Sequence, residues 1–242
     1  HSAFRSIRLG EQSGGIIYTQ RLGFIDLAHT RNAADLTWTC YQRIRPALAE
    51  SRPRVLLAGA EPSLFLVHLD YPPGWDTLPP QGRERVIDHF AVQLAVRMGY
   101  VISTWHEVLT SFGFHGVAGI PEEQSAFAYD DQPSHLLGAV AAGEAIRQMQ
   151  SADTTYNQAM TAALAEVLAD YGALDSRGTR QAVAAARGVW WGIEGPSMRQ
   201  VHLGMRGEPF TPKLIPPAEG DSAPGSTPPA ILDHTDPIEV RF

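Results

Sequence analysis

The most constraining feature of this sequence is a long apolar segment that runs from Pro80 to Phe112 with no internal proline. Its apolar side chains recur at helical spacing on several faces, which predicts a long, central and largely buried helix. They are Val86, Ile87, Phe90, Leu94, Met98, Val101, Ile102, Trp105 and Leu109. Polar and ionisable residues such as Arg97, His106 and Glu107 interrupt the segment more densely than a membrane span tolerates. We therefore expect a soluble domain organised around this helix.

Shorter elements are predicted on both sides of the central helix. Before it we expect a strand at 16–19, a helix at 24–48 closed by Pro46 and Pro53, and two strands within 54–69 separated by Glu61-Pro62. After it we expect helices at about 133–149, 153–171 and 175–187, and a strand at 200–205. The predicted fold class is α+β and predominantly helical, with a buried central helix (about 80–112), flanking shorter helices and a small β element. Residues 1–206 should form a single globular domain, and the Pro- and Gly-rich residues 207–242 an extension that wraps the domain or is mobile.

Composition excludes several classes of protein. The chain has 242 residues, 44% of them hydrophobic, which is enough for a packed core. Its formal net charge of −7 argues against a surface built to neutralise phosphates, so nucleic acid is not expected as a partner. Cys40 is the single cysteine, which excludes an internal disulfide and favours a small buried side chain over a nucleophile. No signal peptide opens the sequence, and we expect that a native leader has been removed from it.

The strongest functional signal lies inside the predicted central helix, where Ser103-Thr104-Trp105-His106-Glu107 places ionisable groups in a buried setting. Burying an unpaired charge costs several kcal/mol, so these groups need partners. One interpretation is a structural hydrogen-bond network between helices. The other is a metal site or an acid-base site.

Two further polar groups are candidates for the same site. Asp26 and His29 share one helical face, so that Asp26 could fix the imidazole tautomer or could simply favour the helix N-terminus. The acidic segment 122–131, which continues to His135, could close over a site, although Asp130-Asp131 before Pro133 is also typical of a plain helix start.

Familiar catalytic templates are absent. His106-Glu107 matches the first two residues of the zincin helix motif, but Thr110 stands where the second histidine is required. Neither the nucleophile elbow of serine hydrolases, nor a P-loop, nor a dinucleotide-binding glycine motif occurs. A site assembled from separated elements remains, and two histidines with one carboxylate are the ligand set of catalytic zinc. We therefore expect His29, His106 and Asp131 as ligands of zinc, with Glu107 as general base.

Several separated stretches resemble a bacterial family catalogued as domain of unknown function 4056, which consists largely of exported envelope proteins and lipoproteins. The matching stretches are Gly23 to Arg31, Trp105-His106-Glu107, Ser125-Ala126-Phe127 with Asp131, Leu136-Leu137-Gly138, Leu203-Gly204 and Thr211 to Pro216. Arg31, in the first stretch, is the second candidate catalytic residue. The chain has His135 where the family pattern leads us to expect Asn, so His135 is discounted as a shared ligand. The resemblance implies an envelope location and no particular activity.

These observations leave three functional hypotheses. The first is a metal-dependent, zinc-containing hydrolase of the periplasm or outer membrane that cuts peptide or amide bonds of peptidoglycan. The second is a non-enzymatic envelope module that binds a cell-wall fragment, lipid or protein, with His106 and Glu107 as a structural polar network. The third is metal-free acid-base catalysis by His106 with Glu107, which lacks an accompanying nucleophile. Convergence of the His29 and His106 side chains beside a carboxylate is the geometric test of the first.

Overall fold

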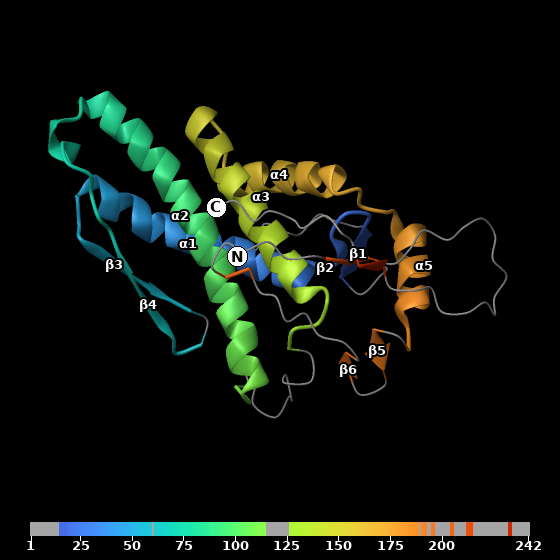
Figure 1. The fold of residues 1–242 in the computed structure, drawn as a ribbon. Helices are drawn as coiled ribbons and strands as arrows, with labels where there is room; N and C mark the ends of the chain where they lie inside the picture. Colours follow the sequence, from blue (N-terminus) through green and yellow to red (C-terminus); the bar gives the residue numbers. More distant parts are fainter. Residues whose placement is uncertain are drawn as a thin grey trace.

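The computed structural model describes residues 15–59, 61–114, 126–188, 190–192, 195–196, 204–205, 212–214 and 232–233. Five helices dominate this part of the chain (Figure 1). They are α1 (Leu27–Ala49), α2 (Pro80–Ser111), α3 (Asp131–Ser151), α4 (Tyr156–Asp170) and α5 (Ser176–Ala186). The strands form four antiparallel pairs: β1 (Ile16–Thr19) with β2 (Gly23–Asp26), β3 (Arg54–Ala58) with β4 (Leu64–His68), β5 (Trp191–Gly192) with β6 (Gly195–Pro196), and β7 (Lys213–Leu214) with β8 (Leu232–Asp233). The α+β, predominantly helical class predicted from the sequence is confirmed.

Helix α2 is the longest element; it crosses α1 and also packs against α3, and α3 in turn packs against α4 (Figure 1). Its buried face carries small and apolar residues, among them Ala91, Ala95 and Ile102, with exposed fractions of 2% or less. Burial of such side chains contributes about 25 cal/mol per Å² of apolar surface removed from water. The prediction of a buried central helix is confirmed. Within the described residues, no helix is long and apolar enough to cross a membrane.

Glycines set the closest helix contacts. A Cβ on Gly99 of α2 would lie 2.0 Å from Thr37 Oγ1 of α1, and a Cβ on Gly138 of α3 would lie 2.1 Å from the Thr30 carbonyl oxygen of α1. Both distances are shorter than any non-bonded contact, so only glycine permits this approach. The two contacts hold α1 between α2 and α3.

The predicted start of the first helix is wrong. Phe24 and Ile25 are fully buried in β2, which follows a turn at 20–22, starts at Gly23 (φ 76°) and pairs with β1; α1 begins only at Leu27. Asp26 caps the helix, because its side chain accepts a hydrogen bond from the Ala28 N–H at 2.6 Å. The short apolar run 24–25 is compatible with a helix or a strand, and its pairing with β1 makes it a strand.

The expectation that Pro46 closes this helix is also wrong, since Pro46 lies inside α1, which continues to Ala49. Proline removes one helical hydrogen bond and crowds the carbonyl four residues earlier, a cost that packing of this last turn of the helix offsets. Ile44, Ala47 and Leu48 supply that packing, because all three are buried.

The remaining elements follow the sequence prediction with small shifts. Strands at 16–19 and within 54–69 are present as β1 and the β3–β4 hairpin. Helix α3 begins at Asp131, two residues before the predicted start, because Pro133 fits into a first helical turn. Of the strand predicted at 200–205, only Gly204 and Met205 are described, and neither lies in a strand. Most of the extension 207–242 lies outside the described residues, but β7 contacts β2 and Leu214 is buried.

Cys40 is buried on α1 with an exposed fraction of 3%. Burial raises the pKa of its thiol to about 12. A thiol of this kind is neutral at physiological pH, which agrees with a packing role.

Candidate metal centre

Helices α1, α2 and α3 bring together three side chains of the types that bind metal ions. His29 lies in the first turn of α1, Glu107 near the end of α2 and His135 in the second turn of α3. One ligand atom from each lies within 4.8 Å of the others. Glu107 Oε1 is 3.8 Å from His29 Nε2 and 3.8 Å from His135 Nε2. The cluster therefore has one carboxylate oxygen between two imidazole nitrogens.

The carboxylate of Glu107 is held by the chain that leads into α3. Its Oε2 accepts a hydrogen bond from the Phe127 N–H at 3.4 Å, and Phe127 has a φ of 61°. A positive φ is unusual for a residue with a large side chain. This backbone conformation directs an N–H at one oxygen of Glu107 and leaves the other oxygen facing the two histidines.

Acidic side chains contact the other ring nitrogen of His29. Its Nδ1 is 3.4 Å from Asp26 Oδ2 and 3.6 Å from Asp131 Oδ1. Asp26, His29 and Asp130 form a second group whose ligand atoms lie within 4.8 Å of one another. A carboxylate beside Nδ1 holds the proton on that nitrogen, so loss of a proton from the ring on metal binding would free Nε2, the nitrogen that faces Glu107.

The cluster contains buried polar atoms that have no hydrogen-bond partner in the described part of the chain. They are His29 Nδ1, Asp130 Oδ1, Asp131 Oδ2 and His135 Nδ1. Most buried polar atoms in proteins are paired, and an unpaired one costs about 1–3 kcal/mol. Four such atoms in one cluster are typical of residues that bind an ion or ordered water.

Several carboxylates lie close together around His29, and their mutual repulsion and burial shift the pKa values of the cluster. Burial acts to lower the pKa of His29, but its contact with Asp26 and the charges of Asp131 and Glu107 raise that pKa to about 10. Burial, with the charge of Glu107, raises the pKa of Asp131 well above its ordinary value, and burial raises the pKa of Asp130 to about 6. Burial and the charges of His29 and His106 lower the pKa of His135, which is therefore a neutral imidazole. Neutral imidazole is the form that binds metal.

The raised carboxyl pKa values predict how the stability of the metal-free protein depends on pH. Asp130 binds more protons in the folded than in the unfolded state between pH 4 and 6, so the free energy of unfolding should fall as the pH rises through this window. Because one pKa unit corresponds to about 1.4 kcal/mol, the share of Asp130 in this loss is about 3 kcal/mol. Denaturant unfolding with chelator at several pH values measures it. Asp130→Asn should flatten the loss, and an unchanged slope in this variant would contradict the assignment.

A pocket of about 350 Å³ opens beside the cluster. Its lining residues come from α1, α2, α3 and the turn between β3 and β4: His29, Asn32, Asp35, Leu36, Thr39, Glu61, Ile102, Ser103, His106 and His135. Among the described lining residues, Asp35 and Glu61 are acidic and none is a lysine or arginine. The cluster thus borders a cavity large enough for a small ligand.

The sequence-predicted residues divide between this cluster and its surroundings. His29, Glu107 and Asp131 come together. His106 lines the same pocket but belongs to neither of the two metal-binding groups, and its Nδ1 lies 3.3 Å from Glu61 Oε2. The exposed side chain of Arg31 faces Asp35 at 4.0 Å instead of the cluster. The roles assigned to these residues stay predictions.

Three members of the site received little or no weight in the sequence analysis. His135 was discounted because the family pattern has asparagine there, yet it is buried beside Glu107. Its spacing of four residues from Asp131 places both on one face of α3, which is a pattern the sequence does contain. The sequence around Asp130 predicts a helix start and nothing more specific. Glu61 sits in a turn, where glutamate is ordinary, so no local pattern indicates that it is buried.

Comparisons with known proteins give a family and no activity. A family model described as "Protein of unknown function (DUF4056)" matches residues 2–201. No curated protein and no solved structure matched the chain. The match covers most of the chain and includes all the residues of the cluster. This chain belongs to the DUF4056 family.

Proposed function

We propose that this protein is a zinc-dependent hydrolase of the bacterial cell envelope that cleaves peptide or amide bonds of peptidoglycan, with the metal held by His29, Glu107 and His135. The observation that carries the proposal is the convergence of these three donors from three helices, with Glu107 Oε1 at 3.8 Å from the Nε2 of each histidine.

The spacing of the donors suits a tetrahedral metal. Zinc–nitrogen and zinc–oxygen bonds of about 2.0–2.1 Å place neighbouring ligands about 3.3–3.4 Å apart. The two 3.8 Å separations between Glu107 Oε1 and the histidine nitrogens are within about half an ångström of that value. The imidazole rings of His29 and His135 are nearly perpendicular, at 84°, with centroids 5.2 Å apart. Small side-chain rotations would complete this coordination.

A metal held by these three residues would accept water as a further ligand, and His29 and His135 both line the pocket from which water would come. Two histidines and one carboxylate are the ligands of several catalytic zinc sites, where the metal lowers the pKa of bound water and polarises a carbonyl. Asp26 and Asp131, which contact His29 Nδ1, would fix the orientation of that ring. The chemistry supported by this arrangement is addition of water to a carbonyl carbon.

The substrate class rests on the pocket and on the family resemblance. A cavity with acidic lining residues and no described basic one suits an uncharged or amine-bearing peptide better than a phosphate or a carboxylate-rich ligand. Peptidoglycan stem peptides are a substrate of this type. The resemblance to exported envelope proteins and lipoproteins supports a periplasmic or outer-membrane-anchored location.

Metal binding by the protein, purified without a His tag, tests the proposal directly. We expect one equivalent of zinc per chain, and one equivalent of cobalt giving the visible absorption of a tetrahedral site. Removal of metal with chelator should lower thermal stability, because a ligand that binds only the folded state stabilises it by mass action. Less than a tenth of an equivalent of any transition metal, together with a stability unchanged by chelator, would exclude the proposal.

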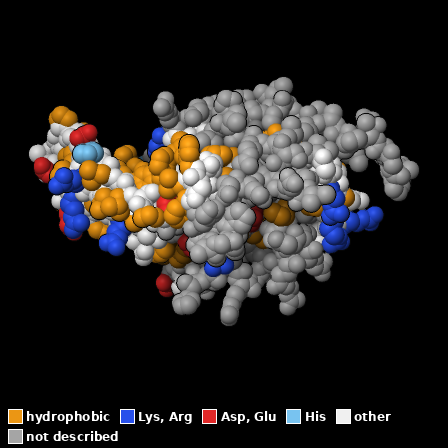
Figure 2. Space-filling model, turned by 90° about the horizontal axis from the view of Figure 1, so that it is seen from below, with side chains coloured by type: hydrophobic (Ala, Val, Ile, Leu, Met, Phe, Trp, Pro, Cys, Tyr) orange, Lys and Arg blue, Asp and Glu red, His pale blue; other side chains and the backbone are white. Residues whose placement is uncertain are grey.

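A second candidate function is a non-enzymatic envelope module, and an apolar groove favours it. This groove of about 230 Å³ lies between β4 and α2 and is lined by Trp75, Val86, Phe90 and neighbouring residues. Leu56, Leu64 and Leu66 are at least half exposed on the opposite face of the β3–β4 hairpin from Val67, which lines the groove. Figure 2 shows hydrophobic side chains exposed on this end of the molecule. Exposed apolar surface of this kind is typical of sites that bind lipid, a cell-wall fragment or a protein.

A further inference from the structure

Glu61 is a buried carboxylate with an unusual position, in the turn that joins β3 to β4. Its side chain is fully excluded from solvent, and its Oε1 has no hydrogen-bond partner among the described residues. The turn makes room for it: a Cβ on Gly59 would lie 2.7 Å from Glu61 Oε1. Burial of a carboxylate costs several kcal/mol unless it is paired, so a hairpin turn that encloses one requires a partner.

The hairpin turn is fixed against α2 by a hydrogen bond. Trp105 Nε1 donates to Ser63 Oγ at 3.1 Å, which attaches the turn to the helix one residue before His106. The Gly59 N–H donates to the Ser63 carbonyl at 3.0 Å and closes the turn. These contacts bring Glu61 Oε2 to 3.3 Å from His106 Nδ1. The partner of the buried carboxylate is therefore the imidazole of His106.

This contact determines which ring nitrogen of His106 is available. A carboxylate accepts hydrogen bonds, so Glu61 favours the tautomer in which Nδ1 carries the proton. Nε2 then has a free lone pair. The His106 side chain is one-third exposed and lines the same pocket as His29 and His135. A histidine oriented by a buried carboxylate, beside a pocket, is the usual arrangement of a general base.

We infer that His106 and Glu61 form the proton-transfer pair of this site, with His106 as the catalytic base and acid and Glu61 as its positioning residue; the inference rests on the proposed hydrolase function. His106 Nε2 takes a proton from water as the water oxygen bonds to the substrate carbonyl carbon. The same proton then passes to the leaving nitrogen as the carbon–nitrogen bond breaks. An amide and one water give a carboxylic acid and an amine, and His106 ends in its starting state. This role was assigned to Glu107 from the sequence, but Glu107 Oε1 faces the two metal-binding histidines instead.

The binding of acetohydroxamate to the cobalt-loaded full chain tests the pair. This probe coordinates metal through its oxygen atoms, as a carbonyl mimic, and donates its N–H to a neighbouring base. We expect His106→Gln and Glu61→Gln to bind cobalt within about threefold of wild type and to bind acetohydroxamate at least tenfold more weakly. His89→Gln, on an exposed part of α2, is the matched control and should change neither affinity. Nitrogen-15 NMR of the histidine rings should show the Nδ1–H tautomer at His106 in wild type and its loss in Glu61→Ala.

Each outcome decides a different part of the inference. Acetohydroxamate affinity within twofold of wild type in His106→Gln would overturn it, as would an Nε2–H tautomer at His106 in wild type. If His106→Gln does not fold, Glu61→Gln and the tautomer measurement decide. A wild-type protein that binds no cobalt, or binds cobalt without acetohydroxamate, would overturn the proposed hydrolase function itself.

Discussion

Replacing His135 by alanine is expected to weaken zinc or cobalt binding at least about 100-fold, equivalent to about 2.7 kcal/mol. His135 is 2% exposed, and its Nε2 lies 3.8 Å from Glu107 Oε1, so it faces the other donors of the cluster. Loss of a direct ligand should cost at least as much as loss of a residue that only orients one, for which 10–100-fold is typical. Isothermal titration of the chelator-treated protein measures the effect.

The matched comparison is His106→Ala, because the sequence alone favoured His106 as a ligand. The structure pairs His106 with Glu61, so its replacement should change metal affinity no more than about threefold. His89→Ala, at an exposed position of α2, controls for loss of a histidine in general. Far-ultraviolet circular dichroism of the metal-free variants checks folding. If His106→Ala loses metal and His135→Ala keeps it, the ligand set proposed here is wrong.

Gly138→Ala is expected to destabilise the protein by about 3 kcal/mol or more, at the upper end of the range for overpacked cores. The new methyl group would lie 2.1 Å from the Thr30 carbonyl oxygen and 2.8 Å from its carbonyl carbon. Both atoms are backbone, so no rotamer change relieves the contact, and α1 and α3 have to separate. Denaturant unfolding of the metal-free protein measures the loss.

The same substitution should also weaken metal binding, because Thr30 follows His29 directly and Gly138 lies one helical turn beyond His135. Separation of the two helices would therefore separate two ligands. Gly82→Ala is the matched control: no atom lies within 4 Å of the added Cβ, and alanine in a helix is favoured over glycine by up to about 1 kcal/mol. Equal stability of Gly138→Ala and wild type would show that the helices do not approach as closely as described.

Much of the architecture was predictable because it depends on local periodicity. The apolar spacing of α2 and the alternation in β3 and β4 record which face of each element is buried. The start of α1 was not predictable in this way, since Phe24 and Ile25 carry no period and their pairing with β1 is a tertiary event. Asp26 has one role that the sequence predicts and one that it does not. Its role as a helix cap is local, whereas its contact with His29 belongs to a cluster that forms only when Asp131 of α3 packs beside it.

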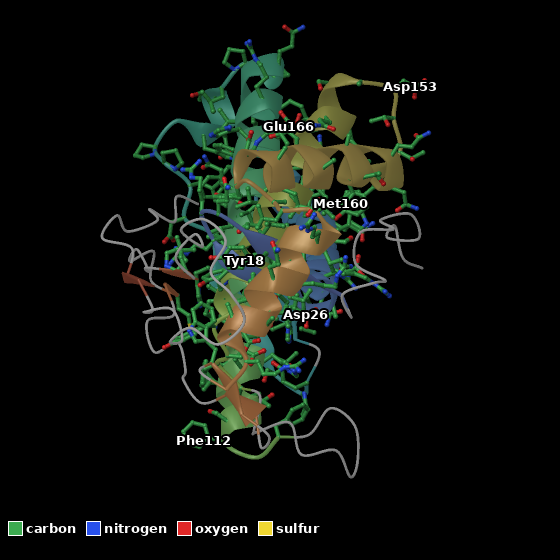
Figure 3. The ribbon with its side chains drawn as sticks, turned by 90° about the vertical axis from the view of Figure 1, so that its right-hand side faces the viewer. Tyr18, Asp26, Phe112, Asp153, Met160 and Glu166 are labelled. Atoms are coloured by element: carbon green, nitrogen blue, oxygen red, sulfur yellow. The ribbon has the colours of Figure 1, made fainter. Side chains whose placement is uncertain are left out.

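In Figure 3, Asp26 lies towards the middle of the molecule, whereas Phe112 marks the far end of α2. The sequence by itself determined that α2 is a long buried helix and that a histidine and a glutamate lie near its end. Only the tertiary structure decided their partners. Neighbouring residues on a helix point about 100° apart, so Glu107 faces α1 and α3 while His106 faces the hairpin turn at Glu61. The pattern of residues along one segment does not show that His106 and Glu107 have different partners. Each contact joins residues that meet only when the helices and the hairpin pack together.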